Sequence, residues 1–96
     1  MLFVVTQVHT PELCPSDNPE LVKKTISVVG SKAHAEKSGI KVFGSYIAPE
    51  EHRLFFIIES NDYGKIVEFF RPIMKIGTLR ITPVSTLGDI IPSKFE

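Results

Sequence analysis

The fold is decided by two apolar runs and the short turn between them, Ile40-Lys41-Val42-Phe43-Gly44-Ser45-Tyr46-Ile47-Ala48-Pro49-Glu50-Glu51-His52-Arg53-Leu54-Phe55-Phe56-Ile57-Ile58-Glu59-Ser60. Both runs are rich in β-branched and aromatic residues, and the second is the most β-prone run in the chain. Pro49 supplies the fixed φ of a first turn position. The stretch therefore predicts a β-hairpin with strands over residues 40–48 and 52–60.

A helix is predicted before this hairpin, over residues 19–38. Asn18 is its expected N-cap and Pro19 occupies the first helical position. Apolar residues then recur at spacings of three and four, and Gly39 is a suitable left-handed C-cap. Gly30 lies in the middle of this helix, where glycine is unfavourable, and it marks either a close approach to the sheet or a kink.

The sequences before and after these elements also have distinct patterns. Residues 2–9 are rich in Phe and Val and predict a first strand, followed by a proline-containing loop over residues 10–17. After the hairpin, Ser60 or Asn61 is expected to cap a helix through Phe70, and Pro72 to end it. Residues 79–84 predict a last strand, in which Pro83 indicates an edge position or a strand end.

The predicted order is therefore β-α-β-β-α-β. Two split βαβ units joined by a hairpin give an α+β, ferredoxin-like sandwich with an antiparallel sheet in the order 4-1-3-2 and both helices on one face. We expect this domain to span residues 1–84. The tail, residues 85–96, is too apolar to lie free in solvent, so we expect it to dock on the sheet or on a partner chain. Its apolar residues are Leu87, Ile90, Ile91 and Phe95.

Composition restricts the class of protein. The chain has 96 residues, enough for one domain, and its formal net charge is zero with no block of like charge. These features argue against binding to nucleic acid or to anionic membranes. One cysteine excludes an internal disulfide framework and fits the cytoplasm. The N-terminus lacks the basic region of a signal peptide, and no apolar run approaches the roughly 18–20 residues of a membrane span.

Side-chain alternation assigns the residues of each strand to one of two faces. The helix-facing set is predicted to be Val4, Val8, Ile40, Val42, Tyr46, Leu54, Phe56, Ile58, Leu79 and Ile81. The open set is predicted to be Phe3, Val5, Gln7, His9, Phe43, Ser45, Ile47, Arg53, Phe55, Ile57, Glu59, Arg80, Thr82 and Val84. An apolar patch of this extent typically marks an interface. We expect a second copy to cover it with two-fold symmetry, giving a homodimeric eight-stranded α+β barrel; the alternative is that the tail folds back over its own sheet.

A family resemblance rests on four stretches. They are the strand at residues 2–9, Pro49-Glu50-Glu51-His52-Arg53 leading into Phe55-Phe56-Ile57-Ile58-Glu59-Ser60, Asn61-Asp62-Tyr63, and Ile81-Thr82-Pro83-Val84. Over residues 1–84 this pattern resembles the small dimeric α+β barrel proteins, and most of all the uncharacterised single-domain families of the DUF3303 or GYD kind. The wider superfamily includes lactone isomerases, cofactor-free monooxygenases and haem-handling enzymes, and the resemblance carries over no active site.

The topology gathers polar residues at one end of the sheet. The first strand ends where the third and fourth begin, and the loop that carries Cys14 leaves from the same end. The residues expected around this barrel mouth are Gln7, His9, Cys14, His52, Arg53 and Arg80. Barrel mouths are common ligand sites, and two arginines suit a carboxylate or another small anion. We therefore predict ligand-binding roles for Gln7, His52, Arg53 and Arg80.

His9 and Cys14 are the candidate catalytic residues. His9 suits a general base at neutral pH, but a histidine at a strand end also serves as a hydrogen-bonded cap. Cys14 is a nucleophile only if its pKa is lowered, and is otherwise a small buried hydrophobe. Arg53 and Arg80 have the alternative of pairing with carboxylates. We expect no cofactor; a metal site formed by His9, Cys14 and His52 is the lesser alternative, because two ligands at this spacing need a third.

Two functions remain open from the sequence. The first is a barrel that binds or converts a small, anionic metabolite near His9, Arg53 and Arg80. The second is a homodimeric structural or regulatory module without catalysis, or a metal-binding protein that uses His9 and Cys14. Neither a substrate nor an enzymatic reaction is specified by the residue pattern.

Overall fold

The computed structural model describes residues 1–15 and 18–91. Its four strands form one antiparallel sheet in the order β2-β3-β1-β4, which is the predicted order 4-1-3-2 read from the other edge. The strands are β1 (Leu2–Val8), β2 (Lys41–Ala48), β3 (Arg53–Glu59) and β4 (Thr78–Val84). The predicted α+β sandwich is confirmed, and β4 lies at an edge, as Pro83 indicated.

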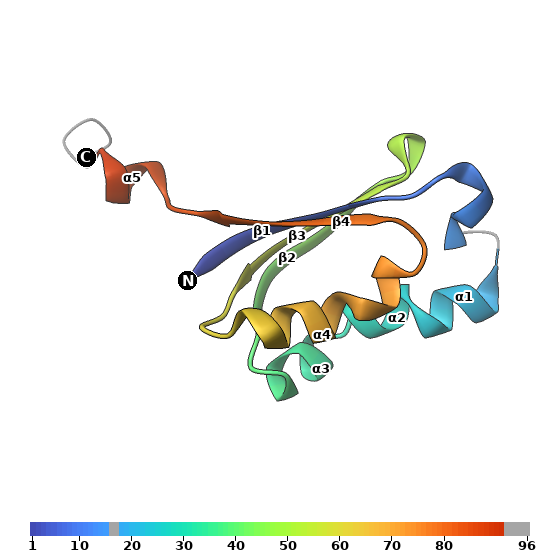
Figure 1. Cartoon of the computed structure of the whole chain (residues 1–96), viewed down its shortest axis with the longest axis horizontal. Coiled ribbons are helices and arrows are strands. Elements are labelled where there is room, and N and C mark those ends of the chain that lie inside the picture. The colour runs from blue at the N-terminus through green and yellow to red at the C-terminus, as the bar shows by residue number, and fades with distance from the viewer. Residues whose placement is uncertain (16–17, 92–96) are drawn as a thin grey trace.

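The helices from α1 to α4 lie on one side of this sheet, and within the described residues no helix lies above its other side (Figure 1). They are α1 (Pro19–Lys24), α2 (Ile26–Val29), α3 (Lys32–Lys37) and α4 (Tyr63–Met74). A last helix, α5 (Leu87–Ile90), continues from β4 beyond the end of the sheet. Phe95 of the tail lies outside the described residues. Among the described helices, none has the length and apolar character needed to cross a membrane.

The helix predicted over residues 19–38 is interrupted twice. Asn18 caps α1 through its side chain, as expected, but the helix ends at Thr25, whose hydroxyl donates to the carbonyl of Leu21. Such back-bonding by a threonine competes with regular helix geometry. A second break falls at Gly30, after which Ser31 caps α3. The kink that Gly30 indicated is therefore a helix end.

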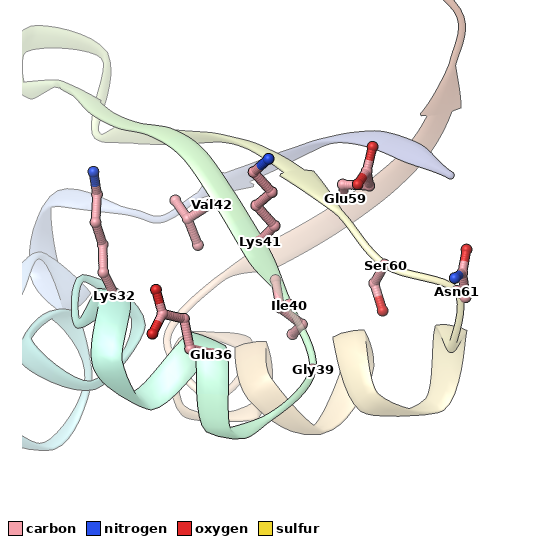
Figure 2. A pocket seen from close by; sticks show the side chains of 9 residues that line it. All are labelled: Lys32, Glu36, Gly39, Ile40, Lys41, Val42, Glu59, Ser60 and Asn61. Carbon is pink, nitrogen blue, oxygen red and sulfur yellow. The ribbon is translucent and has the colours of Figure 1, made fainter.

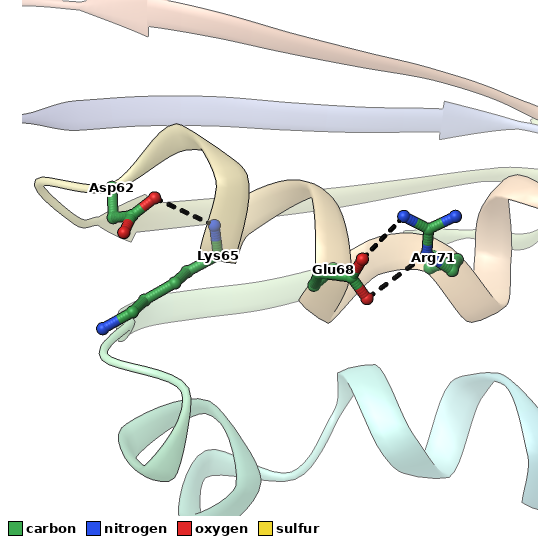
Figure 3. A network of polar contacts seen from close by, with 4 residues as sticks. All are labelled: Asp62, Lys65, Glu68 and Arg71. Carbon is green, nitrogen blue, oxygen red and sulfur yellow. Dashed lines mark hydrogen bonds and ion pairs between the residues drawn. The ribbon is translucent and has the colours of Figure 1, made fainter.

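Two predictions about α4 were wrong. Its N-cap is Asp62 rather than Ser60 or Asn61, with a carboxylate oxygen that accepts from the amide of Lys65 (Figure 3). The helix also passes through Pro72 to Met74. Proline disfavours this position, but the last turn carries Ile73, which is fully buried, so packing outweighs the local cost.

The core lies between the helices and the covered side of the sheet. Phe70 of α4 packs its ring 4.9 Å from the ring of Phe56 on β3 and 4.9 Å from that of Phe69. The buried apolar residues of this cluster are Phe3, Val5, Val29, Ala35, Ile40, Leu54, Phe56, Ile58, Ile66, Phe69, Phe70, Ile73 and Ile76. This cluster fixes which side of each strand faces the helices.

The predicted faces of β1 were inverted. Phe3 and Val5 lie opposite Ile58 and Phe56, and all four are buried under the helices. Val4 and Val8 face the open side instead. The first strand is central and apolar on both sides, so alternation alone did not reveal which set faces inward.

Because of this inversion, the polar residues at the end of β1 also lie on the helix-covered side. Gln7 lies opposite Leu54 on the helix-covered side and is fully buried. His9, which follows the strand, is also buried and contacts Gln7 through its ring. The prediction that Gln7 and His9 share the open face with Arg53 and Arg80 was therefore wrong.

A β-bulge shifts the second half of β2. The register moves between Val42 and Gly44, so Tyr46 lies opposite Phe55 on the open side, while Ser45 and Ile47 turn to the helix side. One extra residue in a strand reverses every later side chain, and the predicted faces of these three residues were wrong for that reason.

Candidate metal centre

Three segments meet where β1 ends and β3 and β4 begin. Val8 lies opposite both Arg53 and Thr78, which confirms the predicted meeting of these strand ends. Directly after the strand, the amide of His9 donates to the carbonyl of His52 over 3.0 Å. The loop after β1 forms a short 3-10 helix, Pro11–Leu13, which ends at Cys14. The hairpin and the loop thus bring two imidazoles and a thiol to one place.

His52 has a backbone conformation that is unusual for a histidine. It is the last residue of the hairpin turn, after the 3-10 helix Pro49–Glu51, and its φ of 51° and ψ of 49° lie in the left-handed region. Among the described residues no other non-glycine residue has a positive φ. Side chains rarely adopt this conformation, and where they do it typically marks a turn or a functional position.

The side chain of Gln7 determines the tautomer of His9. The amide nitrogen of Gln7 donates to the carbonyl of Ile73 at the end of α4 over 3.0 Å. Its amide oxygen lies 2.8 Å from Nδ1 of His9. Because this oxygen only accepts, Nδ1 must carry the proton and donate to it. Nε2 of His9 is consequently the nitrogen with the lone pair.

The available nitrogens of both histidines lack partners. Nε2 of His9 and Nδ1 of His52 are buried side-chain atoms that make no hydrogen bond. The two rings lie edge to face, with centroids 5.6 Å apart. One ligand atom from each of His9, Cys14 and His52 lies within 4.8 Å of the other two. An unsatisfied buried nitrogen needs an explanation, and a bound ion or a water molecule is among the usual ones.

The electrostatics keep His9 in the form that binds metals. Burial, and after it the proximity of His52, lower the pKa of His9 below its ordinary value of 6.5. Its neutral imidazole is therefore the prevailing form at pH 7. Hydrogen bonding of the other ring nitrogen to Gln7 matches the outer-shell arrangement of metal-ligating histidines.

The two arginines lie on the other face of the sheet from Gln7. Arg53 and Arg80 occupy open-face positions, Arg53 opposite Val8 and Arg80 opposite Thr6, as their strand alternation predicted. Arg80 is exposed and Arg53 is half-buried, with its Nε making no hydrogen bond. The expected mouth is thus divided by the sheet, with Gln7 and His9 on the helix side and the arginines on the other.

A separate hollow lies at the opposite end of the sheet. It has a volume of about 580 Å³ and lies between α3 and the ends of β2 and β3 (Figure 2). Its charged lining is mixed, with Lys32 and Lys41 beside Glu36 and Glu59. It contains neither histidine nor cysteine, so it offers no chemistry comparable to that of the cluster.

Sequence reasoning missed two supports of the cluster. One is the carbonyl of Ile73, which holds Gln7. The other is Gly77, where an added Cβ would meet the carbonyl oxygen of Val8 and lie 2.6 Å from Nε2 of Gln7. A glycine placed directly before a strand was the available signal, because such glycines commonly permit close backbone approach.

Comparison with known proteins gives the chain a family but no activity. None of the curated proteins compared with it matches significantly. A family model described as a domain of unknown function, DUF3303, matches residues 1–93, nearly the whole chain, in line with the resemblance seen in the strand and hairpin patterns. The chain belongs to the DUF3303 family.

Proposed function

We propose that this protein binds a soft or borderline transition-metal ion, of the Zn²⁺ or Cu⁺ class, through His9, Cys14 and His52. The observation that carries the proposal is the pair of buried, unpartnered imidazole nitrogens beside the thiol. Thiolate together with imidazole is a donor set that favours these ions over Mg²⁺ or Ca²⁺. Among the functions considered from the sequence, metal binding is therefore the one that the geometry supports best.

The dimensions of the cluster suit such an ion. Metal–nitrogen bonds of about 2.0 Å and metal–sulfur bonds of about 2.3 Å put ligand atoms roughly 3.3–3.8 Å apart in tetrahedral geometry. The present limit of 4.8 Å needs only a small side-chain adjustment to reach this range.

Three protein ligands leave a coordination position open. Structural zinc sites typically have four protein ligands, whereas sites that bind water or substrate keep one position free. We propose that a small molecule occupies this position, which preserves the predicted small-molecule ligand while separating it from Arg53 and Arg80. A cytoplasmic location accords with the proposal, because reducing conditions keep a cysteine from being oxidised to a disulfide.

Metal titration of the reduced, metal-free protein tests the proposal. Zn²⁺, and Cu⁺ without oxygen, are titrated against a chromophoric chelator, and Co²⁺ serves as the spectroscopic probe of a thiolate ligand. We expect one ion per chain and a Co²⁺–thiolate charge-transfer band that is lost in Cys14→Ser. His9→Ala and His52→Ala should each weaken binding more than 100-fold, beyond the 10–100-fold of an outer-shell change.

His34→Ala is the matched control. His34 lies on α3, where its ring stacks against Phe69 with centroids 5.4 Å apart, outside the cluster. The variant should bind metal as the wild type does. The proposal would be overturned if the wild type bound no metal. It would also be overturned if Cys14→Ser and His9→Ala bound metal as tightly as the wild type does.

We also propose that the protein is a homodimer through its open sheet face. Phe43 and Tyr46 on this face are 50% and 57% exposed, an unusual state for large aromatic side chains. The short helix α5 extends beyond the sheet with Leu87 and Ile90 exposed, which supports docking of the tail on a partner. Sedimentation velocity over a dilution series tests this proposal, and a monomer at every concentration would reject it.

A further inference from the structure

The open face carries opposite charges at its two ends. Arg53 begins β3, and Glu59 ends the same strand on the same face. Neither belongs to an ion pair, since the described part of the chain contains a single one, between Arg71 and Glu68 on α4. Nε of Arg53 is also buried without a hydrogen bond. The chain thus leaves a cation and an anion unpaired at the two ends of one strand.

Lys41 lies beside Glu59 on the neighbouring strand but forms no ion pair with it. The two residues are cross-strand neighbours at the acidic end of the face, and both point away from α3 (Figure 2). The ammonium of Lys41 instead lies 5.0 Å from the ring centroid of Phe43. Glu59 therefore remains available to a cation from outside the chain.

The surface between the two charges is mostly apolar, and its polar members are Thr6, Arg80 and Thr82. The apolar residues are those on the open side of the central strands and their neighbours, Leu2, Val4, Phe43, Phe55, Ile57 and Val84. An apolar centre with opposite charges at its ends is complementary to itself when a copy is turned end for end.

Two face-to-face arrangements with two-fold symmetry keep the strands of the two sheets aligned with one another. If the axis runs parallel to the strands, like ends meet and β3 lies over the partner's β1. Arg53 then covers Val8 of the partner subunit, and both charges are buried without partners, which is strongly unfavourable. If the axis runs across the strands, each strand lies over its own copy in reverse direction, which places Arg53 opposite Glu59 of the partner subunit.

We propose that a second copy of this chain covers the open face in the reversed arrangement, with two symmetry-related Arg53–Glu59 ion pairs across the interface. The same rotation sets apolar residues against apolar residues, Phe55 over the partner's Ile57 and Leu2 over the partner's Val8. It also brings Lys41 toward the turn of the partner that carries Glu50 and Glu51. This inference rests on the homodimer proposed above and specifies its geometry.

A charge-exchange experiment tests the arrangement. Arg53→Glu and Glu59→Arg each place like charges opposite one another, so each chain alone should dissociate at least ten-fold more readily than the wild type. An equimolar mixture of the two variant chains restores two opposite-charge pairs, and it should form a mixed dimer near wild-type affinity. Sedimentation velocity on each chain and on the mixture gives the result, and Arg71→Glu on α4 is the control that should dimerise normally.

A milder pair of variants covers the case in which a reversed charge disturbs folding. Arg53→Gln and Glu59→Gln both remove the same ion pair, so the double variant should dissociate no more readily than either single variant. Wild-type protein that is monomeric throughout would overturn both the homodimer and its arrangement. A wild-type dimer with no rescue in the mixture, or with additive effects of the Gln variants, would overturn the arrangement alone.

Discussion

Both faces of the sheet carry large apolar residues, but the two faces have very different surroundings. On the helix side, Phe56 and Ile58 are buried in a continuous core, whereas on the open side Phe43 and Tyr46 remain at least half exposed. Adjacent residues of the same strand, such as Phe55 and Phe56, thus have different roles although they are identical in type. The covered face stabilises the chain itself, and the open face is the surface of the proposed homodimer.

Phe55 and Phe56 allow the largest test of this comparison. Phe56→Ala should lower the free energy of unfolding by about 3–5 kcal/mol, because it removes a buried ring that packs on Phe70. Phe55→Ala should lower it by only about 1 kcal/mol in dilute protein, since its ring is half-buried. Urea denaturation at low protein concentration gives both values. Equal losses would mean that the faces do not differ in this way.

The sequence was sufficient to predict the architecture because hydrophobic periodicity and turn residues locate the helices and strands. They do this without specifying which side of a strand faces the core. Pro49 and the runs around it located the hairpin, and Asn18 located a helix start. Which side of β1 faces the helices was not predictable, because Phe3 and Val4 are both apolar and either suits a buried position. The only sign of the bulge was the isolated Gly44 within the strand, and because it was not interpreted as a bulge, the faces of Tyr46 and Ile47 were assigned wrongly.

The candidate site was predictable in its location, whereas the side of the sheet on which its residues lie was not. The meeting of strand ends followed from topology, and it placed His9, Cys14 and His52 at one end of the sheet. The separation of His9 from Arg53 depends on side-chain direction, which the strand pattern left ambiguous. Two features of the site arise from tertiary contacts that no local sequence signal describes. They are the left-handed conformation of His52 and the hydrogen bond from the side chain of Gln7 to the carbonyl of Ile73.

Gly77 tests how closely the covered side is packed around Gln7. A Cβ at this position would overlap the carbonyl of Val8, so Gly77→Ala should cost about 3 kcal/mol of unfolding free energy. Gly88 is the matched control, because no atom lies within 4 Å of its added Cβ, and Gly88→Ala should be neutral or slightly stabilising. Thermal melts of the metal-free proteins measure both. A neutral Gly77→Ala would show that the strand start has room to shift.

Gln7 and its open-face neighbour Thr6 give the next effect. Gln7→Leu leaves the proton on Nδ1 of His9 and the carbonyl of Ile73 without partners, and it should cost about 2 kcal/mol in the metal-free protein. It should also weaken metal binding 10–100-fold, because the ring of His9 loses its orienting contact. Thr6→Val should change stability by less than about 0.5 kcal/mol. Chelator competition and urea melts test these values, and unchanged metal affinity in Gln7→Leu would remove Gln7 from the site.

The smallest effect is expected at the ion pair of α4. Arg71 and Glu68 approach to 2.7 Å, but their side chains are 55% and 68% exposed, and the pair is one turn apart on a single helix (Figure 3). Such pairs contribute about 0.2–0.5 kcal/mol and weaken with salt. Arg71→Gln should therefore shift the urea midpoint barely beyond error, while dimerisation stays unchanged. A large loss of dimer in this variant would mean that net charge, rather than the position of Arg53 and Glu59 on the open face, governs association.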